Sequence, residues 1–144
     1  MRFAKIVCPV DFSEGSRAAL EAAVELARRS PDAALELMHV YELPAEMYAR
    51  GVYAAPQLLD SIRQDAEERL EAWRRDAVEL GAGRVAAVAV RGSPASTICR
   101  RARAEASDLL VVGTRGRTGL VEMLIGSVAE RVVRHAPCTV LVVR

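Results

Sequence analysis

Glycine is concentrated in one fifteen-residue stretch, "GTRGRTGLVEMLIGS", which runs from Gly113 to Ser127. A glycine at the end of a buried strand lets a ligand approach the backbone, and a second one permits a tight turn at positive φ. The unpaired amides that open the following helix, with a serine hydroxyl beside them, form a ready anion site. The spacing therefore predicts a phosphate-binding loop that uses Gly113, Gly116, Gly126 and Ser127.

A second segment, "PVDFS" from Pro9 to Ser13, follows the first apolar run. Asp11 is a candidate ligand contact, with capping of the next helix as the alternative, and Ser13 is better placed for the cap. His39, at the end of another apolar run, is interpreted as a packed histidine. His135, near a helix C-terminus, is interpreted as structural.

The glycine-rich loop also has structural interpretations. Its glycines could serve only as turns, and Gly126 with Ser127 could simply cap a helix. Arg115 and Arg117 either neutralise phosphate or lie solvated at the loop tip. A Walker A loop is excluded because it needs a lysine and the chain has none after Lys5, and GxGxxG is missing after the first strand.

Five short apolar runs alternate with segments of helical spacing, and their lack of polar alternation is typical of a parallel sheet covered on both faces. The expected strands are 3–10, 35–40, 84–90, 108–113 and 138–143. The expected helices are 16–29 with an earlier start near Glu14, 59–80 stopped by Gly81 and Gly83, one opened by Ser93 and Pro94, and 127–135. The segment 41–56 is interpreted as a loop or lid.

This pattern predicts an α/β fold whose five-stranded parallel sheet has the order 3-2-1-4-5, with helices on both faces. In such a sheet a crevice opens where the connections leaving strands 1 and 4 diverge. The segments 9–13 and 113–127 are both expected at the mouth of this crevice. The stripe Leu59, Ile62, Ala66, Leu70, Trp73, Ala77 and Leu80 is interpreted as core.

Bulk composition restricts the class of protein. The 144 residues fit a single domain, 1–144, and the 20 basic and 19 acidic side chains give no global field for nucleic acid or an anionic membrane. The apolar runs are too short to span a membrane, and the N-terminus does not read as a signal peptide, which favours the cytoplasm. Cys8, Cys99 and Cys138 are expected to be buried, reduced thiols.

The chain resembles the universal stress proteins. The resemblance rests on the spacing Gly113-x2-Gly116-x9-Gly126-Ser127, on "PVDFS", and on "GSVAERVVRHAPCTVLVV" at the C-terminus, and it extends over the whole chain. These motifs are typical of the family's ATP-binding branch. The resemblance implies a Rossmann-like fold of the adenine nucleotide alpha hydrolase type.

The resemblance also implies roles for individual residues. Asp11 would contact the adenosine moiety, Pro9 and Val10 would shape the wall, Val40 would pack on adenine, and Gly113 would lie by the ribose. The phosphate contacts would come from Gly116, Gly126, Ser127 and Val128. Mg²⁺ or Mn²⁺ could bridge the phosphates, and the sequence contains no dedicated metal cage.

Two features depart from the family's pattern. Many relatives carry a basic residue or histidine within the segment Val121-Glu122-Met123, and Thr139 stands where a second proline is frequent. Both lie outside the glycine spacing, so they affect the expected charge around the phosphates.

Three functions remain open from the sequence. The first is an ATP-binding regulatory or stress-tolerance protein that acts through nucleotide occupancy and as a homodimer joined by the last strand. The second is a slow ATPase or phosphotransfer enzyme, for which the motif offers no lysine and no paired carboxylates. The third is a dimeric interaction module that binds no nucleotide.

Overall fold

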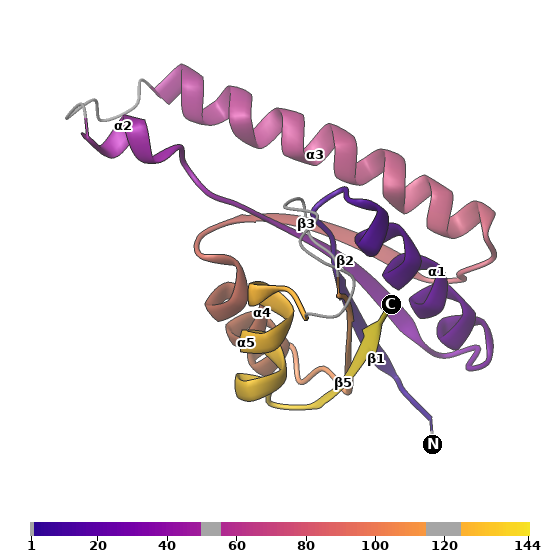
Figure 1. The fold of residues 1–144 in the computed structure, drawn as a ribbon. Coiled ribbons are helices and arrows are strands. Elements are labelled where there is room, and N and C mark those ends of the chain that lie inside the picture. The colour runs from indigo at the N-terminus through magenta and orange to yellow at the C-terminus, as the bar shows by residue number, and fades with distance from the viewer. Residues whose placement is uncertain (1, 50–55, 115–124) are drawn as a thin grey trace.

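A computed structural model of the chain describes residues 2–49, 56–114 and 125–144. Within these ranges five parallel strands form one sheet with the order β3-β2-β1-β4-β5, as predicted. Helices α1 and α3 cover one face of the sheet, and α4 and α5 cover the other (Figure 1). Neighbouring strands β1 and β4 are therefore left by connections that lie on opposite faces.

The strands and helices alternate along the chain almost as expected. Their bounds are β1 (Lys5–Pro9), α1 (Glu14–Arg28), β2 (Ala34–Tyr41), α2 (Ala45–Ala49), α3 (Pro56–Glu79), β3 (Val85–Arg91), α4 (Pro94–Ala104), β4 (Leu109–Gly113), α5 (Ser127–His135) and β5 (Thr139–Val143). The expected and observed strand bounds differ by at most two residues at either end.

Two hydrophobic cores fill the space on either side of the sheet. Leu20 and Val24 of α1 and Leu70 of α3 pack with strand residues on one side. Ile98 of α4 and Val132 of α5 pack with strand residues on the other. The central strands β1 and β4 are buried on both faces, which explains their uninterrupted apolar sequences.

The prediction of a loop for 41–56 is wrong in part. Tyr41 belongs to β2, a short helix α2 covers Ala45–Ala49, and α3 begins at Pro56. Proline is tolerated just before or at the start of a helix, and alanine, glutamate and methionine favour helix, so Pro44 and Pro56 do not prevent these two helices. Residues 50–55 lie outside the described part of the chain.

The predicted core stripe of α3 is confirmed only in its middle. Ala66, Leu70 and Ala77 are buried, whereas Leu80 lies beyond the helix end and is 45% exposed. Gly81, at φ 104, reverses the chain there and carries Leu80 away from the core. The first turns of α3 extend past the sheet (Figure 1), so the helical spacing continues where there is little to pack against.

The two predicted helix caps differ in their chemistry. Ser13 accepts a hydrogen bond from the Ser16 amide at 3.2 Å, as an N-cap side chain should. Ser93 has the position of an N-cap before Pro94, but its side chain makes no capping bond. Ser93 is therefore the N-cap of α4, as predicted, without a hydrogen bond from its side chain.

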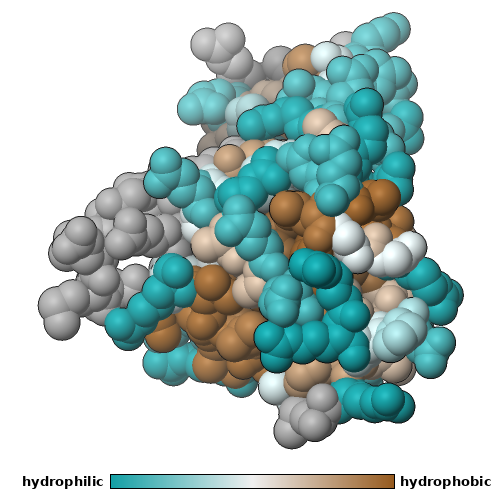
Figure 2. Space-filling model, turned by 90° about the vertical axis from the view of Figure 1, so that its right-hand side faces the viewer, coloured by the Kyte–Doolittle hydropathy of each residue, from teal (hydrophilic) through white to brown (hydrophobic). Residues whose placement is uncertain are grey.

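The surface turned to the viewer in Figure 2 is largely hydrophilic, with hydrophobic areas between the charged side chains. Many charged side chains of the described helices are paired at helical spacing, such as Arg74 with Glu71 in α3 at 2.8 Å. No helix in the described ranges is both long and apolar enough to cross a membrane.

Candidate functional site

The carboxyl ends of β1 and β4 lie side by side. Ile6 is opposite Leu109 and Val7 is opposite Leu110 in the parallel register. The segment that follows β1 therefore emerges next to Gly113 at the end of β4. This is the edge of the sheet at which the strand order predicts a crevice.

Two backbone hydrogen bonds place the start of α5 at the same edge of the sheet. The Thr114 amide donates to Val143 of β5 at 2.8 Å, and the Gly126 amide donates to Thr114 at 2.9 Å. Gly126 is the N-cap of α5. The structure thus brings Gly113, Gly126 and Ser127 together although thirteen positions separate the two glycines in the sequence.

The first turn of α5 has backbone donors to offer. The described residues provide no acceptor for the amides of Ser127 and Val128, and the first backbone bond of the helix is donated by Glu130 to Gly126 at 2.9 Å. These amides and the positive end of the helix dipole favour an anion. The Glu130 carboxylate in the same turn opposes an anion, but Arg134 pairs with it at 2.8 Å.

Asp11 takes part in the hydrogen bonds that open α1. Its Oδ1 accepts from the Ser13 amide at 3.0 Å and from the Ser16 hydroxyl at 2.6 Å, and the Ser13 hydroxyl also donates to it. Asp11 therefore has a local structural role beside the ligand contact predicted for it. These bonds hold its carboxylate in a defined orientation at the end of β1.

Other predicted wall residues differ in how accessible they are. Pro9 and Val40 are half-buried at the ends of β1 and β2. Val10 is only 4% exposed; its amide donates to Met38 at 2.8 Å, and its carbonyl lies 2.7 Å from Nδ1 of His39. We therefore expect Val10 to support the wall from behind. His39 is a buried, packed histidine, as predicted.

Gly113 has a packing role that the sequence did not reveal. A Cβ at this position would collide with the backbone carbonyl of Gly15 in the first turn of α1. The absence of a side chain thus lets α1 approach β4 closely. This reason is independent of any ligand beside the same glycine.

Sequence reasoning missed the residue between Asp11 and Ser13. Phe12 has φ 65, a left-handed conformation that is rare for an aromatic residue. Such a conformation costs about 1–3 kcal/mol and persists only where its surroundings hold it. No signal in a single sequence marks this position, because phenylalanine is neither a turn residue nor a glycine substitute.

Several expected contributors lie outside the described residues. These are Gly116, Arg115, Arg117 and the segment 121–123. Among the residues that are described, no three His, Cys, Asp or Glu side chains gather as a metal site would require.

The three free cysteines are not activated nucleophiles. Burial raises the pKa of the Cys8 thiol to about 12. Burial also raises the pKa of Cys99 and of Cys138, and the nearby Asp108 charge raises that of Cys138 further. Cys8 and Cys99 are buried as expected, while Cys138 is only half-buried.

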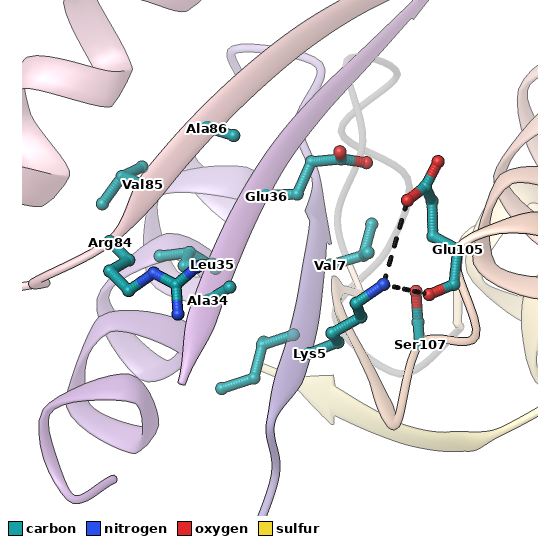
Figure 3. A pocket seen from close by; sticks show the side chains of 11 residues that line it. Lys5, Val7, Ala34, Leu35, Glu36, Arg84, Val85, Ala86, Glu105 and Ser107 are labelled. Atoms are coloured by element: carbon teal, nitrogen blue, oxygen red, sulfur yellow. Dashed lines mark hydrogen bonds and ion pairs between the residues drawn. The ribbon is translucent and has the colours of Figure 1, made fainter. Parts of the chain in front are cut away.

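A cavity of about 400 Å³ lies at the opposite, amino-terminal edge of β1, β2 and β3. Two of its charged side chains pair with protein groups: Lys5 bonds the Glu105 carbonyl at 2.7 Å (Figure 3), and Glu36 binds Arg101 in a bidentate pair at 3.0 and 2.8 Å. None of its lining residues belongs to the N-terminus of a helix. We therefore favour the carboxyl ends of β1 and β4 over this cavity as the functional site.

Comparison with known proteins places this architecture in a family. The family model described as "Universal stress protein family" matches residues 2–144. The chain belongs to the universal stress protein family. Universal stress protein YxiE of Bacillus subtilis is 34% identical to it over 149 aligned positions, which cover 99% of each protein.

Solved structures of universal stress proteins share this fold. UspA from Lactobacillus plantarum superimposes with a TM-score of 0.83 at 28% identity, covering 100% of this chain and 99% of that one. A universal stress protein in complex with cAMP gives 0.71 at 27% identity, with coverages of 100% and 98%. The Arabidopsis thaliana family protein At3g01520 with AMP bound gives 0.67 at 26% identity, with coverages of 97% and 90%. Adenine nucleotides thus bind to relatives of this universal stress protein.

Proposed function

We propose that this universal stress protein binds ATP in the crevice at the carboxyl ends of β1 and β4. The observation that carries the proposal is the first turn of α5. Its Ser127 and Val128 amides have no acceptor among the described residues, and the preceding Gly126 donates to Thr114, next to the end of β4. Relatives that hold cAMP and AMP support an adenine nucleotide as the ligand. The polyphosphate would bind to these amides as an anion binds to any helix N-terminus.

The proposed contacts follow the orientation of the crevice. Asp11 and Pro9 at the end of β1 and Val40 at the end of β2 would hold adenosine, with Val10 behind them. Gly113 would lie beside the ribose. The phosphates would bind to Gly126, Ser127 and Val128 and to Gly116, with Mg²⁺ or Mn²⁺ between the phosphate oxygens.

We infer a regulatory role rather than rapid turnover. Fast phosphoryl transfer needs positioned charge beside the γ-phosphate and a group that orients the attacking water. The described residues of the crevice include no lysine, and the Asp11 carboxylate already accepts bonds from α1. The protein would then act in the cytoplasm, as a single domain, through nucleotide occupancy.

Dimerisation would involve the last strand. Strand β5 lies at the edge of the described sheet, and its Leu141 is 37% exposed. An apolar edge strand exposes unpaired backbone groups that a second copy can cover. Leu141→Glu should therefore shift the protein toward monomer in analytical ultracentrifugation, while an unchanged mass would contradict this interface.

Isothermal titration calorimetry with ATP tests the proposal. Gly126 has φ −59, which leucine tolerates, so Gly126→Leu should block the phosphate site without straining the backbone and should abolish measurable binding. The matched control is Gly83→Leu, because a side chain there would meet open space. Binding that is equal in both variants would refute the site, and no binding by the wild type would refute the function.

A measurement of phosphate release from ATP distinguishes the regulatory function from the alternative of a slow enzyme. We expect turnover well below about one per second, the low end for enzymes. Faster release that Gly126→Leu abolishes would favour an enzyme on the same site. A nucleotide-independent module would show neither calorimetric heat nor phosphate release.

A further inference from the structure

The left-handed Phe12 is held by side chains from two other elements. Its ring lies 4.5 Å from the His39 ring of β2 and 5.4 Å from the Trp73 ring of α3, measured between centroids. The Arg69 guanidinium lies 4.3 Å over the Phe12 ring. We call Phe12, His39, Arg69 and Trp73 the Phe12 clamp.

The clamp also contacts the chain before and after the turn. His39 meets the Val10 carbonyl through Nδ1 at 2.7 Å, so the residue that packs on Phe12 also holds the end of β1. On the other side, Arg17 of α1 lies 3.9 Å over the Trp73 ring and pairs with Asp76 at 2.8 Å. Strand β2 and helices α1 and α3 therefore all contribute to holding one turn.

That turn sets the place of Asp11. Because Phe12 adopts positive φ, the chain bends between Asp11 and Ser13, and the Asp11 carboxylate accepts hydrogen bonds from the Ser13 amide and the Ser16 hydroxyl. Without the ring contacts, only the hydrogen bonds of Asp11 with Ser13 and Ser16 would offset the cost of the left-handed conformation. The backbone would relax to negative φ and carry Asp11 away from the end of β1.

We propose that Phe12 is a positioning residue for nucleotide binding, acting through Asp11 and held in place by the Phe12 clamp. The inference rests on the proposed ATP function. On this proposal, the ring contacts of Phe12, a strained and half-buried residue, serve to position the site as well as to pack the core. Arg69 and Trp73 then influence the crevice from α3, a helix that contributes no ligand contact itself.

The chain offers a matched control. Its two phenylalanines, Phe3 and Phe12, are both partly buried against the same core, on the α1 and α3 side of the sheet. Phe3 precedes β1 and Phe12 follows it, so they lie at opposite ends of that strand. The same change to leucine removes an aromatic ring from one core in both cases, but only one of them belongs to the clamp.

The test compares ATP dissociation constants from calorimetry with stability from urea unfolding. Phe12→Leu should weaken ATP binding about tenfold, Phe12→Tyr should restore it to within about twofold, and Phe3→Leu should leave it unchanged. Arg69→Gln, a surface change that does not threaten folding, should weaken binding about two- to fivefold through the lost cation–π contact. Emission of Trp73, the sole tryptophan, should change in Phe12→Leu and not in Phe3→Leu.

The outcomes separate this proposal from the one it rests on. If the wild type binds ATP and both Phe12→Leu and Arg69→Gln bind it equally well, the positioning role is overturned while the ATP function stands. If Phe3→Leu weakens binding as much as Phe12→Leu, the effect is one of core stability and the positioning role is again overturned. If the wild type does not bind ATP, both proposals fail.

Discussion

At the scale of single residues, the fold depends on backbone conformations that side chains would disturb. Gly113→Ala should destabilise the protein by about 1–3 kcal/mol, the usual cost of overpacking, because its Cβ would collide with the Gly15 carbonyl and push α1 from β4. Urea unfolding measures this change. Gly83→Ala is the control, since its Cβ meets no atom, and equal stability of the two variants would contradict the packing role.

At a second position the chain carries a side chain where the backbone conformation favours glycine. Ala106 has φ 50 after the end of α4, where glycine is favoured, and the following Ser107 amide bonds back to Ala102 at 2.9 Å. We expect Ala106→Gly to stabilise the fold by about 0.5–1 kcal/mol. The matched Ala104→Gly, at the last helical position of the same α4, should instead destabilise it. If the two substitutions changed the thermal unfolding midpoint in the same direction, that would contradict left-handed strain at Ala106.

At the scale of elements, helix α5 carries the proposed phosphate site. Ser127 is the first residue of α5, after the N-cap Gly126, so its hydroxyl has no capping role to lose. Ser127→Ala should therefore weaken ATP binding about tenfold through one lost hydrogen bond to a charged group, while the unfolding midpoint without ATP stays the same. A lower midpoint with unchanged affinity would show that the hydroxyl serves the helix only.

Most of the strands and helices could be predicted from the sequence, but one helix and the contacts between elements could not. Strands β1 and β4 were predictable because burial on both faces leaves uninterrupted apolar runs, and α5 was predictable from its cap and its breaker at Pro137. Helix α2 was missed because prolines and glycine on either side indicate a loop, whereas its own residues favour helix. The Phe12 clamp was missed because its members come from three separate elements.

At the scale of the whole molecule, buried thiols link stability to pH. Burial raises the pKa of Cys8 to about 12, above the ordinary value of about 8.5 that the unfolded chain retains. The unfolded state thus loses its proton first, and the stabilising contribution, complete below about pH 8.5, is lost as pH rises toward about 12. In Cys8→Ala the free energy of unfolding should fall less steeply between pH 9 and pH 11, by up to about 1.4 kcal/mol per pH unit. If the free energy of unfolding fell equally steeply with pH in the wild type and in Cys8→Ala, that would contradict the burial of a neutral thiol.

The whole molecule also has two ends that could bind a ligand, and amide NMR with ATP distinguishes them directly. We predict that saturating ATP shifts the amide resonances of Asp11, Gly113, Ser127 and Val128 at the carboxyl ends of the strands. The amides of Lys5, Glu36 and Ser107, which line the opposite hollow, should stay in place. Shifts confined to that hollow, or no shifts at millimolar ATP, would contradict the account.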